Sequence, residues 1–188
     1  MGEQAYIAEF LSERASPELM DVFSRAIDRA EAVGTQTQLA HLTGPLLDDA
    51  RVSARVSESV RNKAKAAVSE QLLELVVPGK GEFAFELASL VEPACALSRD
   101  LGAERVSPLS FLATCLAADV PLDRTSVRTQ ELLRSAGLTV EILVPTSITS
   151  DTRRQDFTYT SLGFGTDLTA MARAGPSVPT LMRQFTWS

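Results

Sequence analysis

The chain has 188 residues, of which 45% are hydrophobic and 22% are charged, and its formal net charge is -6. This composition is ordinary for a globular protein and allows one sizeable domain with a tail. The acidic balance and the lack of a Lys/Arg run argue against non-specific nucleic-acid binding, which needs a basic surface. No apolar run reaches the roughly 20 residues that span a bilayer, and the acidic N-terminus does not resemble a secretory signal. We therefore expect a cytoplasmic protein without nucleic-acid or membrane partners.

Residues 1–15 form a short amphipathic segment ahead of the main pattern. Its apolar side carries Tyr6, Ile7, Phe10 and Leu11. This spacing predicts either a leading helix packed on the domain or part of an interface.

A first pair of helices is predicted next. Ser16 can cap a helix and Pro17 suits its first position. This helix is expected to run to about Val33, and residues 34–38 then connect it to a second helix. The second apolar stripe consists of Leu39, His41, Leu42, Leu46 and Leu47. Because Pro45 lies inside that stripe and lacks a backbone donor, the second helix is expected to kink or to start late.

Residues 48–77 carry a further helical pattern. Its mostly apolar positions step by three and four, at Val52, Val56, Val60, Ala64, Val68, Leu72 and Leu75. The pattern fits one long helix or two helices with a break near residues 57–62. The breaker at residues 78–81, which reads P-G-K-G, then marks the join between two halves of the chain.

The stretch from Glu86 to Leu116 repeats the first helix pair. A constant offset of 68 relates Glu18 to Glu86 and Gly34 to Gly102, and each glycine follows an apolar stripe where a left-handed C-cap is expected. After one inserted residue, an offset of 69 relates His41, Leu42, Leu46 and Leu47 to Ser110, Phe111, Cys115 and Leu116. Stripe, glycine, connector and second stripe recur in the same order, which predicts a duplicated helical domain.

The end of the second half is predicted to hold two shorter helices. Residues 117–123 read as a loop, and Thr125 or Ser126 can cap a helix that Gly137 ends. Thr139 can cap a last short helix over residues 140–144.

These patterns predict an all-α fold of about eight helices in two pseudo-twofold-related repeats, followed by an extended linker. The linker is expected because residues 146–161 are polar and rich in Ser and Thr. The predicted boundaries are an N-terminal extension at 1–15, the helical domain at 16–145, the linker at 146–161 and a further segment at 162–188.

No catalytic constellation is visible. Residues 78–81 do not form a phosphate-binding loop, because no Ser or Thr follows the lysine and no strand precedes it. His41 is the only histidine and lies on an apolar helix face, where packing is its expected role. Cys95 and Cys115 also lie on apolar faces and are expected to be core residues in a reducing compartment. We therefore expect no enzyme activity, catalytic residue, metal or cofactor in this chain.

The paired helices resemble the Clp N-terminal domain, the double Clp repeat of ClpA-, ClpB- and ClpC-type AAA+ unfoldases. That family's repeat contains I/V-[ST]-x-x-H-L-L-x-A-L; the second copy here reads V-S-P-L-S-F-L-A-T-C-L from Val106, and the first places His41 and Leu42 at the His-Leu pair. The later stretch LLRSAGLTVEILV is similar to the family's closing pattern L-L-x-x-x-G-[VI]-x-x-x-x-L. The resemblance covers about residues 16–144.

Residues 162–188 strengthen the resemblance. GTDLTAMARAGPSVPTLMR looks like the segment that opens the first ATPase module of this family, G-x-D-L-T-x-x-A-x-x-G-x-x-x-P-x-x-x-R. The matching residues are Gly165, Asp167, Leu168, Thr169, Ala172, Gly175, Pro179 and Arg183.

The helical repeats depart from the family pattern at two places. Gly44 and Pro45 interrupt a helix that is continuous in the family, and Leu109 stands where an acidic residue is usual.

The resemblance implies a domain that binds unfolded or tagged protein substrates, or an adaptor protein, and passes substrates to the AAA+ ring of its parent protein. ATP and Mg would be needed only in a following ATPase module. The family's groove implies peptide or adaptor contacts by Leu97, Leu101, Leu109 and Ser110, although Leu97 and Leu101 also fit ordinary core positions. The alternatives are a free-standing Clp-repeat adaptor or regulator and a specialised module for one dedicated protein partner.

Overall fold

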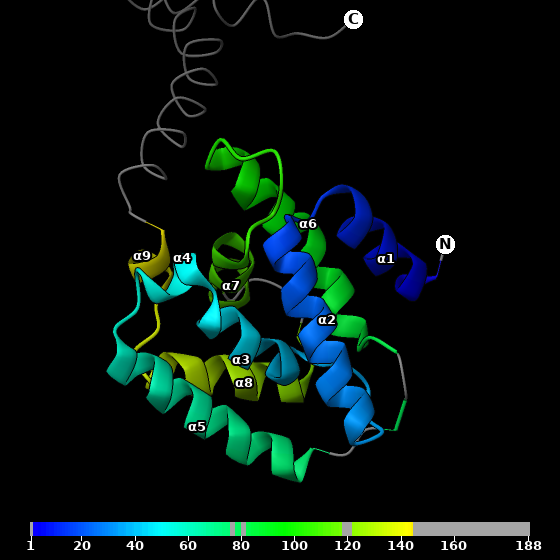
Figure 1. Ribbon diagram of the computed structural model, residues 1–188, viewed down its shortest axis with the longest axis vertical. Helices are drawn as coiled ribbons and strands as arrows, with labels where there is room; N and C mark the ends of the chain where they lie inside the picture. Colours follow the sequence, from blue (N-terminus) through cyan, green and yellow to red (C-terminus); the bar gives the residue numbers. More distant parts are fainter. Residues whose placement is uncertain (1, 76–77, 80–81, 118–121, 145–188) are drawn as a thin grey trace, which may run out of the picture. The chain divides into compact units, whose positions relative to one another are not determined.

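The computed structural model describes residues 2–75, 78–79, 82–117 and 122–144, all within a compact unit that spans Met1–Thr146. The segments predicted as a linker and as the beginning of an ATPase module, 146–161 and 162–188, lie outside the described residues. Within the described ranges every regular element is a helix, which confirms the predicted all-α class (Figure 1). The nine helices found there are α1 (Glu3–Glu13), α2 (Pro17–Ala32), α3 (Leu39–Asp48), α4 (Ala50–Ser53), α5 (Glu58–Glu74), α6 (Phe85–Asp100), α7 (Pro108–Leu116), α8 (Arg124–Ser135) and α9 (Val140–Leu143). None of them has the length and apolar content that crossing a membrane requires.

The helices fall into the two predicted repeats. Helices α2 and α6 open them, and both have 16 residues, aligned by the offset of 68. Helix α2 packs on α3, and the equivalent α6 packs on α7. Helices α5 and α8 lie side by side beneath α3 and join the two repeats into one body (Figure 1).

Both opening helices end in the same way. Gly34 and Gly102 adopt the left-handed conformation, with φ of 69° and 72°, as expected for C-cap glycines. The residue after each glycine donates a backbone hydrogen bond back to its helix, from Thr35 N to Ala30 O at 3.0 Å and from Ala103 N to Ser98 O at 2.8 Å. The predicted stops are therefore confirmed.

A crossed pairing of backbone segments links the repeats. Ala15, just before α2, bridges to Val106 in the connector of the second repeat, and Phe83, just before α6, bridges to Thr37 in the connector of the first. The same offsets of 68 and 69 relate Ala15 to Phe83 and Thr37 to Val106. The matching hydrogen bonds are Ser16 N to Val106 O at 2.9 Å and Ala84 N to Thr37 O at 2.9 Å, then Val106 N to Arg14 O at 2.8 Å and Thr37 N to Glu82 O at 2.8 Å. Each connector thus holds the opening of the other repeat, which is what a pseudo-twofold relation requires.

The leading helix α1 packs on α6 and, less extensively, on α2. Its Ile7 and Phe10 are buried, so the amphipathic segment is part of the domain core. The buried ring of Phe23 on α2 makes edge-on contacts with Phe10, Phe83 and Phe111, at centroid distances of 6.5, 6.0 and 5.4 Å. One aromatic cluster therefore unites α1, the first repeat and the second repeat.

Three local predictions are now settled. Helix α3 starts at Leu39 and runs through Pro45, so the late start was wrong; neighbouring helices bury almost the whole segment, and tertiary packing offsets the lost hydrogen bond. The pattern over 48–77 forms two helices, but the break lies at residues 54–57 and not near 57–62 as predicted, since α5 already begins at Glu58. The cap of α8 is Asp123, whose carboxylate accepts from Ser126 N at 2.7 Å, and not one of the two hydroxyl residues expected.

Candidate functional site

The predicted contact residues surround the connector of the second repeat. Leu97 lies in the last turns of α6, Leu101 caps the end of that helix, and Leu109 lies in the first turn of α7. All three side chains are half-buried and pack against the core while leaving part of their surface accessible. A side chain that is half in the core can still offer an apolar edge to a ligand, so this placement fits both roles that the sequence left open and selects neither.

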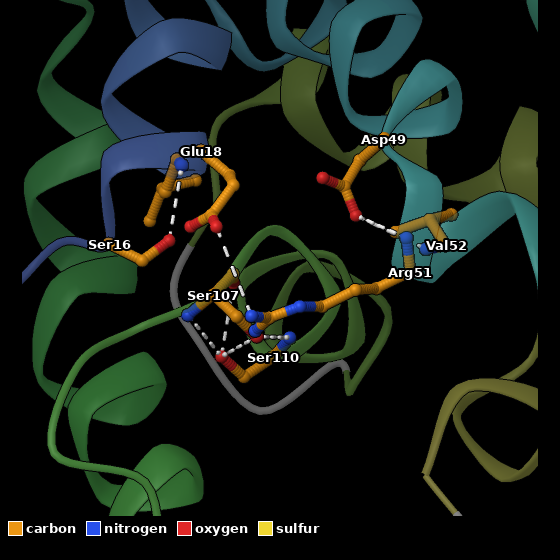
Figure 2. A network of polar contacts seen from close by, with 8 residues as sticks. Ser16, Glu18, Asp49, Arg51, Val52, Ser107 and Ser110 are labelled. Atoms are coloured by element: carbon orange, nitrogen blue, oxygen red, sulfur yellow. Dashed lines mark hydrogen bonds and ion pairs between the residues drawn. The ribbon is translucent and has the colours of Figure 1, made fainter.

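Ser110 is placed differently. Its side chain is only 2% exposed. Its Oγ accepts hydrogen bonds from Ser107 N at 3.0 Å and from Ser98 Oγ at 2.8 Å, and Ser107 Oγ accepts from Ser110 N at 3.2 Å in return. This reciprocal capping box begins α7 (Figure 2). The hydroxyl is used inside the protein, so its role in the structure is to hold the helix start.

Helix starts from both repeats meet around this capping box. Figure 2 shows Ser16 at the start of α2, Asp49 at the start of α4, and the side chain of Arg51 extending toward Glu18. The Arg51–Glu18 pair is loose, with 3.9 Å between Nη2 and Oε1, and both groups are largely exposed. A hydrogen bond from Ser16, and then its own backbone N–H, lower the pKa of Glu18. These contacts cap helices, and an exposed pair of this kind contributes little to stability.

A hollow of about 360 Å³ opens beside the second connector, between the end of α1 and α6. It is lined by Arg14, Glu92, Cys95, Ser98, Arg99, Glu104 and Val106. Arg14 Nη1 lies 2.9 Å from Glu92 Oε1, and the Tyr6 hydroxyl donates to the same oxygen at 2.8 Å. These contacts, the bond from Tyr6 first, lower the pKa of Glu92, whereas burial and this carboxylate raise the pKa of Tyr6. One wall of the hollow is therefore a fixed polar cluster.

The sequence did not identify this hollow. Arg14 and Glu92 lie in α1 and α6, far apart in the chain, and meet only because α1 packs on α6. No spacing within one helix carries that information. The only available signal was the duplication, which places the connectors of the two repeats at equivalent positions.

The other residues considered for chemistry lie in the core. Cys95 and Cys115 are free thiols in the hydrophobic core, and burial raises the pKa of Cys115. His41 is buried, its Nδ1 accepts from Gln38 N at 3.2 Å, and burial followed by the charge of Arg29 lowers its pKa. In the part of the chain that the structure describes, His, Cys, Asp and Glu side chains do not gather in threes as a metal site would need.

A scan against protein-family models gives no match, and no curated protein matches the chain. Among solved structures, one with a similar fold is the crystal structure of the N-terminal domain of the caseinolytic protease associated chaperone ClpD from Arabidopsis thaliana. It is 18% identical, with a TM-score of 0.49, and the match covers 75% of this chain and 96% of that one.

Proposed function

We propose that this chain is the N-terminal domain of a Clp-type AAA+ chaperone or unfoldase and that it binds protein substrates or an adaptor. The observation that carries the proposal is the crossed pairing of the two repeats, in which Ala15 bridges to Val106 and Phe83 bridges to Thr37. The sequence motifs that resemble the Clp repeat lie on the helix pairs related by this pairing. A duplicated motif in matching structural positions supports the resemblance more strongly than either motif alone.

The binding surface would be the second connector. Leu97, Leu101 and Leu109 offer apolar edges there, and the hollow lined by Glu92 and Glu104 lies beside the same connector. Apolar side chains next to polar groups that fix orientation are typical of sites for peptide segments. The bound segment would belong to an unfolded or tagged substrate or to an adaptor.

Under this proposal the chain itself is not an enzyme. It would deliver its cargo to an AAA+ ring, and ATP and Mg would act only in a following ATPase module, whose beginning the sequence of residues 162–188 resembles. The proposed setting is the cytoplasm, with protein partners only.

The test is an NMR titration of the labelled chain with a permanently unfolded protein. We expect shifts clustered between Leu97 and Phe111, and a Leu101→Ser variant should bind about fivefold more weakly, which corresponds to about 1 kcal/mol. Val33 occupies the equivalent position in the first repeat and is 69% exposed, so Val33→Ser is the matched control and should bind normally. Absence of shifts at millimolar ligand would reject the proposal.

The difference between the repeats keeps one alternative open, a module that binds a single dedicated partner. The first repeat has its own hollow of about 260 Å³, whose lining includes Arg29, Asp48 and Lys65, with an ion pair between the last two. A charged hollow suits a specific folded partner better than unfolded chains. Binding of one folded protein with no affinity for unfolded protein would select this alternative.

A further inference from the structure

The two connectors are covered to different extents. In the first repeat, Thr35 forms an antiparallel bridge with Pro78, in the segment that joins the repeats, and Thr35 is 1% exposed. The equivalent residue of the second repeat, at the offset of 68, is Ala103, which is exposed. No residue in the described ranges pairs with Ala103 as Pro78 pairs with Thr35. The second connector has one inserted residue, but both connectors begin at a left-handed glycine, and in the described residues only the first is paired with the segment that joins the repeats.

The covering segment fits closely in the first repeat. A Cβ atom added at Gly79 would overlap the side chain of Gln36, so only glycine suits this approach. Gln36 Nε2 also donates to Glu82 Oε2 at 3.2 Å. The chain's own Pro78–Gly79 segment therefore lies on the first connector in the way that a bound peptide would.

The second connector offers the matching space. Glu104, equivalent to Gln36 and nearly identical in shape, lines the hollow of about 360 Å³ together with Val106, the equivalent of Thr37. Glu104 is exposed, whereas Gln36 is half-buried. The hollow also falls within the range of volumes that bind small ligands and short peptide segments.

We propose that the second connector binds an extended peptide segment of a protein partner, paired with the backbone at Ala103 as Pro78 is paired with Thr35 in the first repeat. The segment needs a glycine where it passes the side chain of Glu104. Addition of an extended strand to exposed backbone is a common mode of peptide recognition. This inference rests on the proposed function and adds the conformation and one side-chain requirement of the captured segment.

The probe is a capped synthetic peptide with the sequence of residues 75–80, LVVPGK. The peptide should not bind to the first connector, because the chain's own residues 78–79 already lie there. They are covalently attached and therefore compete at a high effective concentration. We expect shifts of the labelled chain at residues 102–106 and at Glu92, and at least about tenfold weaker binding when the glycine of the peptide is replaced by valine, since the added side chain would overlap Glu104.

Two variants of the chain complete the test. Glu104→Phe should abolish peptide binding by filling the hollow, whereas Glu31→Phe, at an exposed position of the first repeat outside the hollow, should retain it; the unfolding midpoints of both variants verify the fold. Shifts away from the second connector, or equal affinity for the glycine and valine peptides, would overturn the inference.

If Glu104→Phe binds unfolded protein normally while Leu101→Ser does not, this inference fails and the proposed function stands. If the peptide binds at residues 102–106 but unfolded protein does not bind, the proposed function fails instead.

Discussion

The two repeats agree in their opening helices and in the pairing of their connectors, and they differ in what surrounds these parts. Both opening helices have 16 residues, both end at a left-handed glycine, and both connectors form the same hydrogen bonds with the other repeat. Yet one connector is covered by the joining segment, and the other borders a hollow. A duplicated unit thus preserves the contacts that hold it together, while surfaces that need not be symmetric can acquire separate roles.

The same contrast is visible at single positions. His41 and Ser110 are equivalent, and each accepts a hydrogen bond from the backbone N–H of its helix cap, at 3.2 Å and 3.0 Å. Two different side chains therefore perform one capping task. The imidazole of His41 can take up a proton in acid and the hydroxyl of Ser110 cannot, so the repeats should respond differently to acid.

The largest expected effect is a difference in stability between substitutions at equivalent core positions of the two repeats. Phe23 contacts three aromatic rings, whereas its equivalent, Val91, is smaller and equally buried. Phe23→Ala should lower the free energy of unfolding by about 3–5 kcal/mol and Val91→Ala by about 2 kcal/mol. Urea denaturation measures both, and equal losses would show that the aromatic cluster does not anchor the first repeat.

A smaller effect tests whether the helix ends are equivalent. Gly34 and Gly102 have similar positive φ angles, and an added Cβ would meet nothing within 4 Å at either position. Gly34→Ala and Gly102→Ala should therefore each cost about 1–2 kcal/mol of unfolding free energy, from backbone strain alone. If the two variants lost clearly different amounts of unfolding free energy, one of the two helix ends would not have the left-handed glycine cap.

The smallest effect is a pH dependence confined to the first repeat. Burial and Arg29 lower the pKa of His41 in the folded state below its ordinary value of 6.5. The unfolded chain then binds the proton more readily, so stability is full above about pH 6.5 and falls as the pH drops from there through the folded-state pKa. His41→Asn, whose amide oxygen can keep the cap, should show a shallower loss of stability in thermal melts as the pH falls below about 6.5. An unchanged slope would exclude His41 as its source.

Much of the fold was predictable because its determinants are local or repeated. Ser16 and Pro17 mark a helix start, Gly34 and Gly102 mark two helix ends, and the constant offset reveals the duplication. The cap at Asp123 was missed because three neighbouring residues can all cap a helix. The late start predicted for the helix that contains Pro45 was wrong, because burial by other helices outweighs a local preference.

The candidate site was less predictable. Leu97, Leu101 and Leu109 were predicted as contact residues from the family resemblance, and they lie at the second connector. Whether Ser110 faces a ligand or the interior depends on its partner Ser98 on another helix, which no local pattern specifies. The hollow depends on α1 meeting α6, and the cover over Thr35 depends on where the joining segment lies. These are tertiary contacts between distant segments.

The most direct test of the account is amide hydrogen exchange at the four residues that form the crossed pairing. The N–H groups of Ser16, Thr37, Ala84 and Val106 each donate to the other repeat. We predict that all four are strongly protected and that Ser16 matches Ala84 while Thr37 matches Val106, since equivalent bonds should open in equivalent events. Rapid exchange at Thr37 and Ala84, with protection only at Ser16 and Val106, would contradict the pseudo-twofold arrangement on which the proposed function and the peptide site depend.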